Sequence, residues 1–174
     1  MASLFRPDKY YKNIYEINYQ LLVNDGIKLI AFDLDNTLVP HDVLVMSEEV
    51  KNMIEKIKKL GFEVIILSNN NQKRVTRFCE KTNIAYYYSC KKPLRRMFKK
   101  VLLDFNLEPS QVCLIGDQVM TDVYGANRMD IMSILVEPIA TRDIIYTKVN
   151  RQLERFVLRK LEKKSLFKIG EYYE

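Results

Sequence analysis

Short apolar runs alternate along this chain with segments in which apolar residues recur every three or four positions. A short apolar run bounded by turn residues predicts a strand buried on both faces, and the wider spacing predicts a helix with one face on a core. The predicted strands are residues 28–33, 62–67, 85–88, 112–115 and 131–136, and the predicted helices are 47–61, 72–81, 93–105 and 119–128. Because strands and helices alternate, we expect an α/β fold with a parallel sheet covered on both faces.

The residue types at the ends of these segments agree with this assignment. Ser47 is a suitable N-cap, because its hydroxyl can accept a hydrogen bond from a free amide in the first helical turn, and Gly61 can end the same helix. Pro93 suits the first turn of the helix that runs toward Phe105. The run Tyr86–Tyr88 is compatible with either an edge strand or a loop.

The length and composition of the chain fit one globular domain. Its 174 residues are enough to bury a core, and the ordinary charged fraction, the five glycines and the lack of low-complexity segments argue against disorder. We therefore expect a single domain over residues 1–174, with an N-terminal extension over residues 1–26 and a basic C-terminal helix over about 141–165.

The cysteines and the apolar segments bear on localisation. Cys79, Cys90 and Cys113 are scattered without metal-binding spacing, which indicates reduced thiols. The N-terminal segment lacks the apolar core of a signal peptide, and no apolar run approaches the ~20 residues that span a bilayer. We therefore expect a cytoplasmic protein that is soluble or sits peripherally on the inner face of the membrane.

The net charge of +6 is concentrated near the C-terminus, between Lys148 and Lys168. Arg151, Arg155 and Arg159 repeat every four residues, so they share one face of a helix, and the apolar residues lie largely on the opposite face. The basic face either stays in water while the apolar face packs on the sheet, or it also contacts anionic lipid or nucleic acid. Charge alone does not separate these partners.

Polar residues stand at the ends of the first four predicted strands. They are Asp33, Asp35 and Thr37 after the first, Ser68 and Asn69 after the second, Lys92 after the third, and Asp117 and Asp122 after the fourth. Parallel strands bring their carboxyl ends to one edge of the sheet, where α/β folds bind their ligands. We therefore expect these side chains to converge although they are distant in sequence.

This combination of side chains suits phosphoryl transfer assisted by Mg²⁺. One carboxylate of the pair Asp33 and Asp35 can attack an electrophile, and the other can move a proton. Together with Asp117 they offer the hard oxygen ligands that Mg²⁺ prefers. Ser68 and Lys92 can hold the phosphate oxygens. Singly, these residues also fit an acidic turn, a solvated lysine, a turn serine and a helix cap, but their combination at four strand ends favours a catalytic site.

Four short motifs carry a resemblance to a known family. Residues 33–37 (Asp-Leu-Asp-Asn-Thr), 67–70 (Leu-Ser-Asn-Asn), 92–93 (Lys-Pro) and 116–122 (Gly-Asp-Gln-Val-Met-Thr-Asp) look like the four ordered motifs of the haloacid dehalogenase (HAD) superfamily. More closely, nearly the whole chain resembles the small bacterial YqeG family of HAD-IIIA phosphatases, which is related to the mitochondrial phosphatases of phosphatidylglycerophosphate. The resemblance implies a HAD-like Rossmannoid three-layer sandwich with a central parallel sheet.

The resemblance also implies a role for each motif residue. Asp33 resembles the nucleophile that forms an aspartyl-phosphate, and Asp35 resembles the acid that protonates the leaving group and then activates water. The metal set for Mg²⁺ would comprise the Asp33 carboxylate, the Asp35 backbone carbonyl and Asp117, with Asp122 acting through a metal-bound water or by orienting Lys92. The substrate phosphate would be held by Thr37, Ser68, Asn69 and Lys92, and Ser68 and Lys92 would complete the catalytic set.

The spacing of the motifs bears on the substrate. About 30 residues separate Thr37 from Ser68, and one helix and one strand use most of them. Between Ser68 and Lys92 there is room for only a helix and a short strand, so we expect no sizeable cap domain and an open site. His41, the sole histidine, lies in the loop after the first motif and either lines the entrance of the site or is loop filler, which is the favoured interpretation. An open site and a basic tail favour a phospholipid headgroup, with phosphatidylglycerophosphate as the first candidate.

Other functions remain open at this point. One is a HAD phosphatase of another large substrate, such as a phosphoprotein or a nucleic-acid end, and another is a non-catalytic, basic RNA-binding or scaffold module. The intact acidic pair argues against the scaffold, because no structural need requires both Asp33 and Asp35. A phosphate-receiver domain is also conceivable, but its phosphorylated aspartate would resemble one that follows the third strand, whereas the acidic pair here follows the first. A P-loop nucleotide site is not supported, because the chain lacks Gly-x-x-x-x-Gly-Lys-Ser/Thr.

Overall fold

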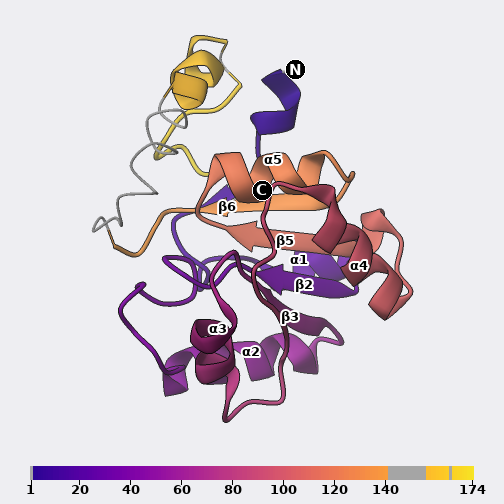
Figure 1. Cartoon of the computed structure of the whole chain (residues 1–174). Helices are drawn as coiled ribbons and strands as arrows, with labels where there is room; N and C mark the ends of the chain where they lie inside the picture. The colour runs from indigo at the N-terminus through magenta and orange to yellow at the C-terminus, as the bar shows by residue number, and fades with distance from the viewer. Residues whose placement is uncertain (1, 141–155, 165) are drawn as a thin grey trace.

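The computed structural model describes residues 2–140, 156–164 and 166–174 (Figure 1). Its centre is a six-stranded sheet in which each pair of neighbouring strands is parallel, in the order β1-β6-β5-β2-β3-β4. The strands are β1 (Lys9–Tyr11), β2 (Leu29–Phe32), β3 (Glu63–Leu67), β4 (Ala85–Tyr87), β5 (Val112–Gly116) and β6 (Met132–Val136).

Helices cover both faces of this sheet. They are α1 (Tyr19–Asn24), α2 (Glu48–Lys59), α3 (Gln72–Cys79), α4 (Arg95–Phe105) and α5 (Tyr124–Asn127), with 3₁₀ turns at Ala2–Phe5 and Pro109–Gln111 and a π-helical turn at Val119–Val123. Helices α1, α2 and α3 share one apolar core with the sheet, and α4 and α5 share the core on the other face (Figure 1). The predicted three-layer α/β sandwich is therefore confirmed.

Strand β2 shows how the sequence produces this layering. All four of its residues are buried, as expected for an apolar run between two helical layers. Ile30 and Phe32 face the core with α1, α2 and α3, whereas Leu29 and Ala31 face the core with α4 and α5. The strand has neighbours on both sides, since β3 and β5 pair with it in parallel.

The predicted elements are present, with their ends shifted by one or two residues. The Ser47 hydroxyl caps α2 by accepting a hydrogen bond from the Val50 amide at 3.3 Å, and Gly61 follows the helix with a φ of +98°. Between Thr37 and Ser68 the chain forms only a loop, α2 and β3. Between Ser68 and Lys92 it forms only α3 and β4, so the prediction that no sizeable cap domain is inserted is confirmed.

Two helix predictions need correction. Pro93 is not in the first turn of α4 but in the turn before it, where the Leu94 amide donates to the Lys91 carbonyl at 2.9 Å. The helix starts later because residues 91–94 form this turn, with Lys91 at a φ of +54°, outside the helical region. The segment predicted as one helix over 119–128 is a π-helical turn followed by α5, because the Asp122 and Val123 amides both donate to the Gln118 carbonyl.

The N-terminal segment contributes more than the expected extension. Residues Lys9–Tyr11 form β1, which pairs with β6, and the Asp8 carboxylate accepts hydrogen bonds from the Ser133 amide at 2.8 Å and its hydroxyl at 3.1 Å. Tyr10 and Tyr11 are buried. The sequence did not reveal β1 because three residues are too short a run for a periodic signal.

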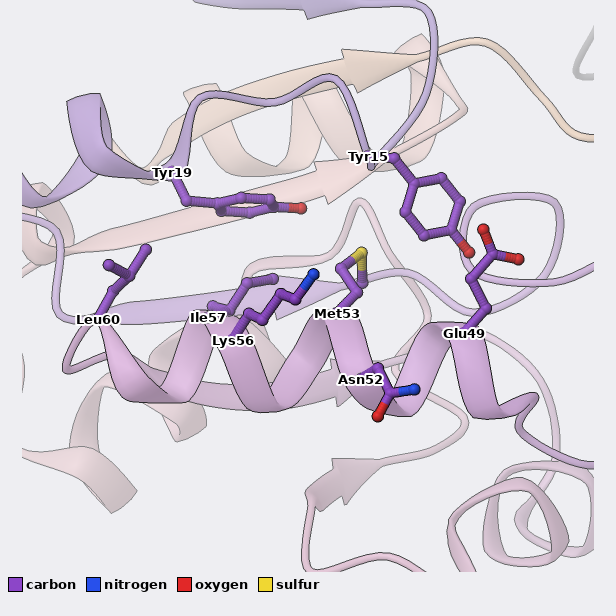
Figure 2. A pocket seen from close by; sticks show the side chains of 8 residues that line it. All are labelled: Tyr15, Tyr19, Glu49, Asn52, Met53, Lys56, Ile57 and Leu60. Atoms are coloured by element: carbon purple, nitrogen blue, oxygen red, sulfur yellow. The ribbon is translucent and has the colours of Figure 1, made fainter.

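A hollow of about 420 Å³ lies between this N-terminal segment and α2. Figure 2 shows the side chains that line it. Tyr15 and Tyr19 form one wall, and Met53, Ile57 and Leu60 of α2 contribute to the other. The residues that line this hollow include none of the predicted site residues. The hollow is therefore separate from the candidate site.

The basic C-terminal segment is described only in part. Residues 156–163 are helical, and the buried side chains of Leu161 and Phe167 pack in a third apolar cluster with Tyr10. Arg159 is exposed, whereas Arg151 and Arg155 lie outside the described residues, so the predicted arginine face stays a prediction. Among the described helices, none has the length and apolar content that crossing a membrane requires.

Candidate active site

The site lies at the carboxyl ends of the two central strands β2 and β5. From β2 the chain continues to β3 and β4 on one side of the sheet, whereas from β5 it continues to β6 on the other. The boundary between β2 and β5 is thus a topological switch point, where open α/β sheets leave a crevice for a ligand. Asp33 directly follows β2, with its amide donating to the Ile115 carbonyl at 2.9 Å, and Asp117 directly follows β5.

A buried lysine joins two of the predicted acids. The Lys92 ammonium lies 2.7 Å from Asp33 Oδ1 and 2.7 Å from Asp122 Oδ1, and only 1% of its side chain is exposed. A buried charge is tolerated only when it is paired, so the two carboxylates explain how this lysine is accommodated. Burial alone would lower the pKa of Lys92, but Asp122 and Asp33 outweigh it and raise that pKa above its ordinary value.

Three carboxylates form a compact, buried oxygen cluster. Ligand atoms of Asp33, Asp117 and Asp122 all lie within 4.8 Å of one another. The Thr37 hydroxyl donates to Asp117 Oδ1 at 3.3 Å. Burial raises the pKa of Asp33 to about 7, and the charges of Asp122 and Asp35 act in the same direction against the opposing effect of Lys92. A divalent cation such as Mg²⁺ would neutralise the excess negative charge and would take the carboxylate oxygens as ligands. These residues therefore fit that ion.

Glycine is required next to this cluster. A Cβ atom on Gly116 would lie 2.4 Å from Cγ of Asp122, which is closer than real contacts allow. Asp122 therefore reaches the end of β5 only because residue 116 has no side chain. The Gln118 amide donates to Asp122 Oδ2 at 3.2 Å and holds the carboxylate in this position.

Asp35 has different surroundings from Asp33, although the two are one residue apart. Arg74 donates to Asp35 Oδ1 from Nε at 3.2 Å and from Nη2 at 2.9 Å, and Asn70 Nδ2 donates to Oδ2 at 3.1 Å. The Asp35 carboxylate is not a member of the oxygen cluster among the described residues, so only its backbone carbonyl remains as a predicted metal ligand. His41, from the loop after the motif, lies beside this acid, with its Nδ1 3.5 Å from Asp35 Oδ1, and the prediction that it is loop filler stays a prediction.

The predicted phosphate ligands also take part in the internal contacts of the site. Asn69 holds the backbone of Lys92, with its Oδ1 accepting from the Lys92 amide at 2.6 Å and its Nδ2 donating to the Lys92 carbonyl at 3.1 Å. The buried Ser68 hydroxyl accepts from the Asn70 amide at 3.1 Å. Contact of Thr37, Ser68, Asn69 and Lys92 with a substrate phosphate stays a prediction.

The sequence reasoning missed two partners of Asp35, namely Arg74 and Asn70. Helix α3 begins at the carboxyl end of β3, so residues in its first turn reach the edge of the sheet where the site lies. Arg74 is the third residue of α3, and its amide donates to the Asn71 side chain that caps the helix. A basic residue at such a helix start, next to a strand end, was the available signal.

Comparison with known proteins gives an independent view of this site. A family model for haloacid dehalogenase-like hydrolases matches residues 41–130. The chain is 38% identical over 164 residues to the "Probable phosphatase YqeG" of Bacillus subtilis, covering 94% of this chain and 95% of that protein. It is 27% identical over 173 residues to "Phosphatidylglycerophosphate phosphatase 1, chloroplastic/mitochondrial" of Arabidopsis thaliana, covering 92% of this chain and 49% of that protein.

Solved structures share the fold. An uncharacterized protein from Listeria monocytogenes serotype 4b matches with a TM-score of 0.54 and 19% identity, over 76% of this chain and 99% of that one. A HAD family enzyme from Bacteroides thetaiotaomicron, in complex with magnesium and inorganic phosphate, matches with a TM-score of 0.53 and 14% identity, over 70% and 99%. With the family model and the whole-length relative, the chain belongs to the haloacid dehalogenase-like hydrolases, as a phosphatase of that family.

Proposed function

We propose that this phosphatase hydrolyses phosphomonoesters with Mg²⁺, through a phosphorylated Asp33, and that its substrate is phosphatidylglycerophosphate. The observation that carries the chemistry is the buried contact of Lys92 with Asp33 and Asp122, beside Asp117. A nucleophilic carboxylate that attacks a phosphate dianion needs nearby positive charge, and here that charge is built into the core of the site.

In the first half of the reaction, an oxygen of the Asp33 carboxylate attacks phosphorus, and the bond between phosphorus and the leaving oxygen breaks. Asp35 gives its proton to that oxygen, so the product leaves as an alcohol. Lys92, which already lies 2.7 Å from Asp33 Oδ1, neutralises negative charge during the transfer. Thr37, Ser68 and Asn69 complete the proposed surroundings of the phosphate.

In the second half, the Asp35 carboxylate takes a proton from water, and the water oxygen attacks phosphorus. The bond between phosphorus and Asp33 breaks, which releases inorganic phosphate and restores both aspartates. When bound, Mg²⁺ would neutralise phosphate charge and orient the phosphoryl group. The proposed ligands are the carboxylates of Asp33 and Asp117, the backbone carbonyl of Asp35 and, through a water, Asp122.

The choice of a lipid substrate is supported by the similarity to the Arabidopsis phosphatase and by the surface around the site. Val43, Leu44 and Val45 are exposed in the loop that follows the acidic motif. Ile139 is also exposed, and its amide donates to the Asn36 carbonyl at 3.0 Å, which puts it beside the same motif. Exposed apolar side chains next to an uncapped site suit a substrate whose phosphate must be reached at a lipid surface.

A cytoplasmic location and peripheral contact with the membrane are part of this proposal. Arg159, Lys160, Lys163 and Lys164 are exposed in the described C-terminal part. Each basic residue near an anionic surface contributes about 1 kcal/mol of attraction, which salt screens. We therefore expect the protein to bind anionic vesicles in low salt and to be released from them in high salt.

The test is phosphate release from a set of substrates with Mg²⁺ and with excess chelator. The set comprises phosphatidylglycerophosphate in vesicles, glyceraldehyde 3-phosphate, a phosphopeptide and a phosphorylated oligonucleotide. Glyceraldehyde 3-phosphate is included because two Pyrococcus phosphatases of that compound match 45% and 48% of this chain. We expect the lipid to have the highest kcat/KM and chelator to stop its turnover. A higher kcat/KM for any other member would reject the lipid substrate, and full activity in chelator would reject the metal.

The exposed apolar residues beside the site, Val43, Leu44, Val45 and Ile139, are called the apolar rim, and their role has its own test. The double variant Leu44→Ser/Val45→Ser should lower activity on lipid in vesicles and leave activity on a soluble phosphomonoester unchanged. The control is Leu103→Ser, because Leu103 is an exposed leucine on α4. Equal activity of the double variant and the control on vesicles would reject the role of the rim.

A further inference from the structure

We infer that Arg74 is a positioning residue that orients the Asp35 carboxylate for proton transfer. The inference rests on the proposed function, because it requires Asp35 to be the general acid and base. The side-chain hydrogen bonds of Arg74 go to Asp35, from Nε and Nη2, and none goes to the oxygen cluster or to Lys92. We therefore expect Arg74 to act on turnover through Asp35.

The guanidinium of Arg74 is held in one place. Its side chain is only 7% exposed, and Nε and Nη2 both donate to Asp35 Oδ1. Its Cζ lies 5.6 Å from the ring centroid of Phe78, and its amide is fixed by the helix cap of Asn71. Burying a guanidinium is unfavourable unless its charge is paired, and Asp35 supplies that pairing through Nε and Nη2, while the buried Nη1 has no hydrogen-bond partner among the described residues.

The carboxylate of Asp35 is in turn held at both oxygens. Oδ1 accepts two hydrogen bonds from Arg74, and Oδ2 accepts one from Asn70. A carboxylate with both oxygens bonded cannot rotate freely about its last torsion. Arg74 and Asn70 come from α3 and from the loop before it, so one short segment supplies all three hydrogen bonds, while His41 from another loop lies 3.5 Å from Oδ1.

This arrangement leaves one oxygen for chemistry. Each carboxylate oxygen has two lone pairs, and Oδ1 accepts two hydrogen bonds from Arg74 and has His41 Nδ1 at 3.5 Å as a further neighbour. Oδ2 has one lone pair left, because Asn70 is its one partner among the contacts of the described residues. The side chain of Asp35 is 18% exposed and that of Arg74 is 7% exposed. Arg74 therefore contacts the carboxylate from the buried side, and the opposite side of the carboxylate is accessible to solvent. Oδ2 is therefore the oxygen that carries the exchanged proton.

The first experiment compares two kinds of phosphate ester in Arg74→Lys and Arg74→Ala. Glycerol 3-phosphate has a poor leaving group that needs a proton, whereas 4-nitrophenyl phosphate has a good one that does not. A correctly placed general acid contributes about 10²–10⁴-fold, so we expect kcat/KM for glycerol 3-phosphate to fall ~10–100-fold. For 4-nitrophenyl phosphate we expect a change of less than ~3-fold, because kcat/KM reports only the steps through formation of phospho-Asp33.

A matched control is available on the same helix. Arg77 lies one turn further along α3 and is exposed, so Arg77→Ala should keep wild-type kinetics on both esters. The second experiment repeats the Arg74 substitutions in an Asp35→Asn background. Because Arg74 acts through Asp35, the loss caused by Arg74→Ala should nearly vanish there.

The outcomes of these experiments distinguish failure of the positioning role of Arg74 from failure of the proposed function. An equal loss on both esters, or a loss that persists in Asp35→Asn, would overturn the positioning role, as would wild-type kinetics in Arg74→Ala. If Arg74→Ala does not fold, Arg74→Lys and Asn70→Ala supply the same comparison, and failure of all three to fold would assign Arg74 to the core instead. If the wild-type protein releases phosphate from none of the esters, the proposed function itself fails and the inference falls with it.

Discussion

Asp33 and Asp35 stand one residue apart in the chain, but the fold gives them different environments. Asp33 is buried at the end of β2 and shares an ammonium with Asp122. Asp35 lies beyond the strand, is partly exposed, and is held by a guanidinium and an amide from the region of α3. Burial raises the pKa of Asp33 to about 7.

The difference explains how two identical side chains can divide one reaction between them. Lysine is a compact point charge that can neutralise a charge that moves, whereas arginine donates in a planar fork that fixes direction. A nucleophile benefits from a neighbouring positive charge, and a proton carrier benefits from a defined orientation. Lys92 therefore places positive charge beside Asp33 at the end of β2, and Arg74 at the start of α3 fixes the orientation of Asp35.

The largest expected effect comes from removing the nucleophile. Asp33→Asn should abolish phosphate release from every ester, because an amide does not form the phosphorylated intermediate. The fold should persist, since the amide has nearly the shape of the carboxylate, and thermal unfolding checks this. Asp42→Asn is the control, because Asp42 is exposed in the following loop. Turnover of Asp33→Asn at the wild-type rate would show that the two aspartates have been given the wrong roles.

Removing the proton carrier should have a smaller and more selective effect. Asp35→Asn should lower kcat/KM for an alkyl phosphate by about 10²–10⁴-fold, which is the usual contribution of general acid–base catalysis. Steady-state kinetics with alkyl and aryl phosphates measure the difference, and the aryl ester should lose much less. A loss of the same size for both esters would mean that Asp35 does not protonate the leaving group.

The metal cluster should respond unequally to loss of its acids. Asp122→Ala should weaken Mg²⁺ binding by ~10–100-fold, the usual cost of losing an outer-shell partner, and Asp117→Ala should weaken it more, because in the proposed set Asp117 contacts the ion directly whereas Asp122 acts through a water. Titration of Mg²⁺ followed by thermal unfolding measures both affinities, since a bound ion stabilises the folded state. A larger loss of Mg²⁺ affinity in Asp122→Ala than in Asp117→Ala would show that Asp122 is the direct ligand and Asp117 the indirect one.

Magnesium binding should also depend on pH. The pKa of Asp33 is about 7 in the metal-free fold and 3.8 ordinarily, so between these values the folded state holds a proton that the unfolded chain has lost. That proton stabilises the metal-free fold at low pH, and its contribution is lost as the pH rises through 7. Because Mg²⁺ needs the deprotonated carboxylate, its affinity should rise by up to about tenfold per pH unit below 7.

Thermal unfolding between pH 5.5 and 8.5, with and without Mg²⁺, measures this linkage. The increase in Tm caused by Mg²⁺ should grow with pH and level off above 7. The same series on Asp33→Asn supplies the control, because that variant has no carboxyl group at this position to titrate. An increase in Tm that is independent of pH in the wild type would contradict the raised pKa.

The smallest effect is expected at His41. Its Nδ1 is 3.5 Å from Asp35 Oδ1 and its side chain is 39% exposed, so the contact is long and screened by solvent. His41→Ala should therefore change kcat/KM by less than ~3-fold, while Arg74→Ala lowers it much more. Parallel kinetics of the two variants on the same alkyl ester make the comparison. A larger loss of kcat/KM in His41→Ala than in Arg74→Ala would show that the loop with His41, rather than α3, orients Asp35.

The layers of the fold were predictable because their signals are local. A buried parallel strand such as Leu29–Phe32 is a continuous apolar run, and Ser47 marks a helix start by its own chemistry. The convergence of Asp33, Lys92 and Asp117 was also predictable, because parallel strands bring their ends to one edge. These predictions need only the direction of the strands, which the alternation with helices supplies.

What the sequence could not supply were contacts set by tertiary packing. The pairing of Arg74 with Asp35 spans 39 residues, and it depends on the angle at which α3 leaves β3. Asn69 also holds the backbone of Lys92, a contact that its place in the motif does not reveal. The clash that a side chain at Gly116 would make with Asp122 is likewise visible only in three dimensions.

The contacts between β1 and Tyr173 determine which backbone groups remain free at this edge of the sheet. The amide and carbonyl of Tyr10 face away from β6, and they bond to the carbonyl and amide of Tyr173 at 2.8 and 3.0 Å. A strand edge with free backbone groups is a template for pairing with another chain. Residue 173 occupies that template at the β1 edge, and the opposite edge, β4, is only three residues long. The β1 edge therefore offers no free backbone groups at Tyr10 for strand addition, and the β4 edge offers only a short stretch.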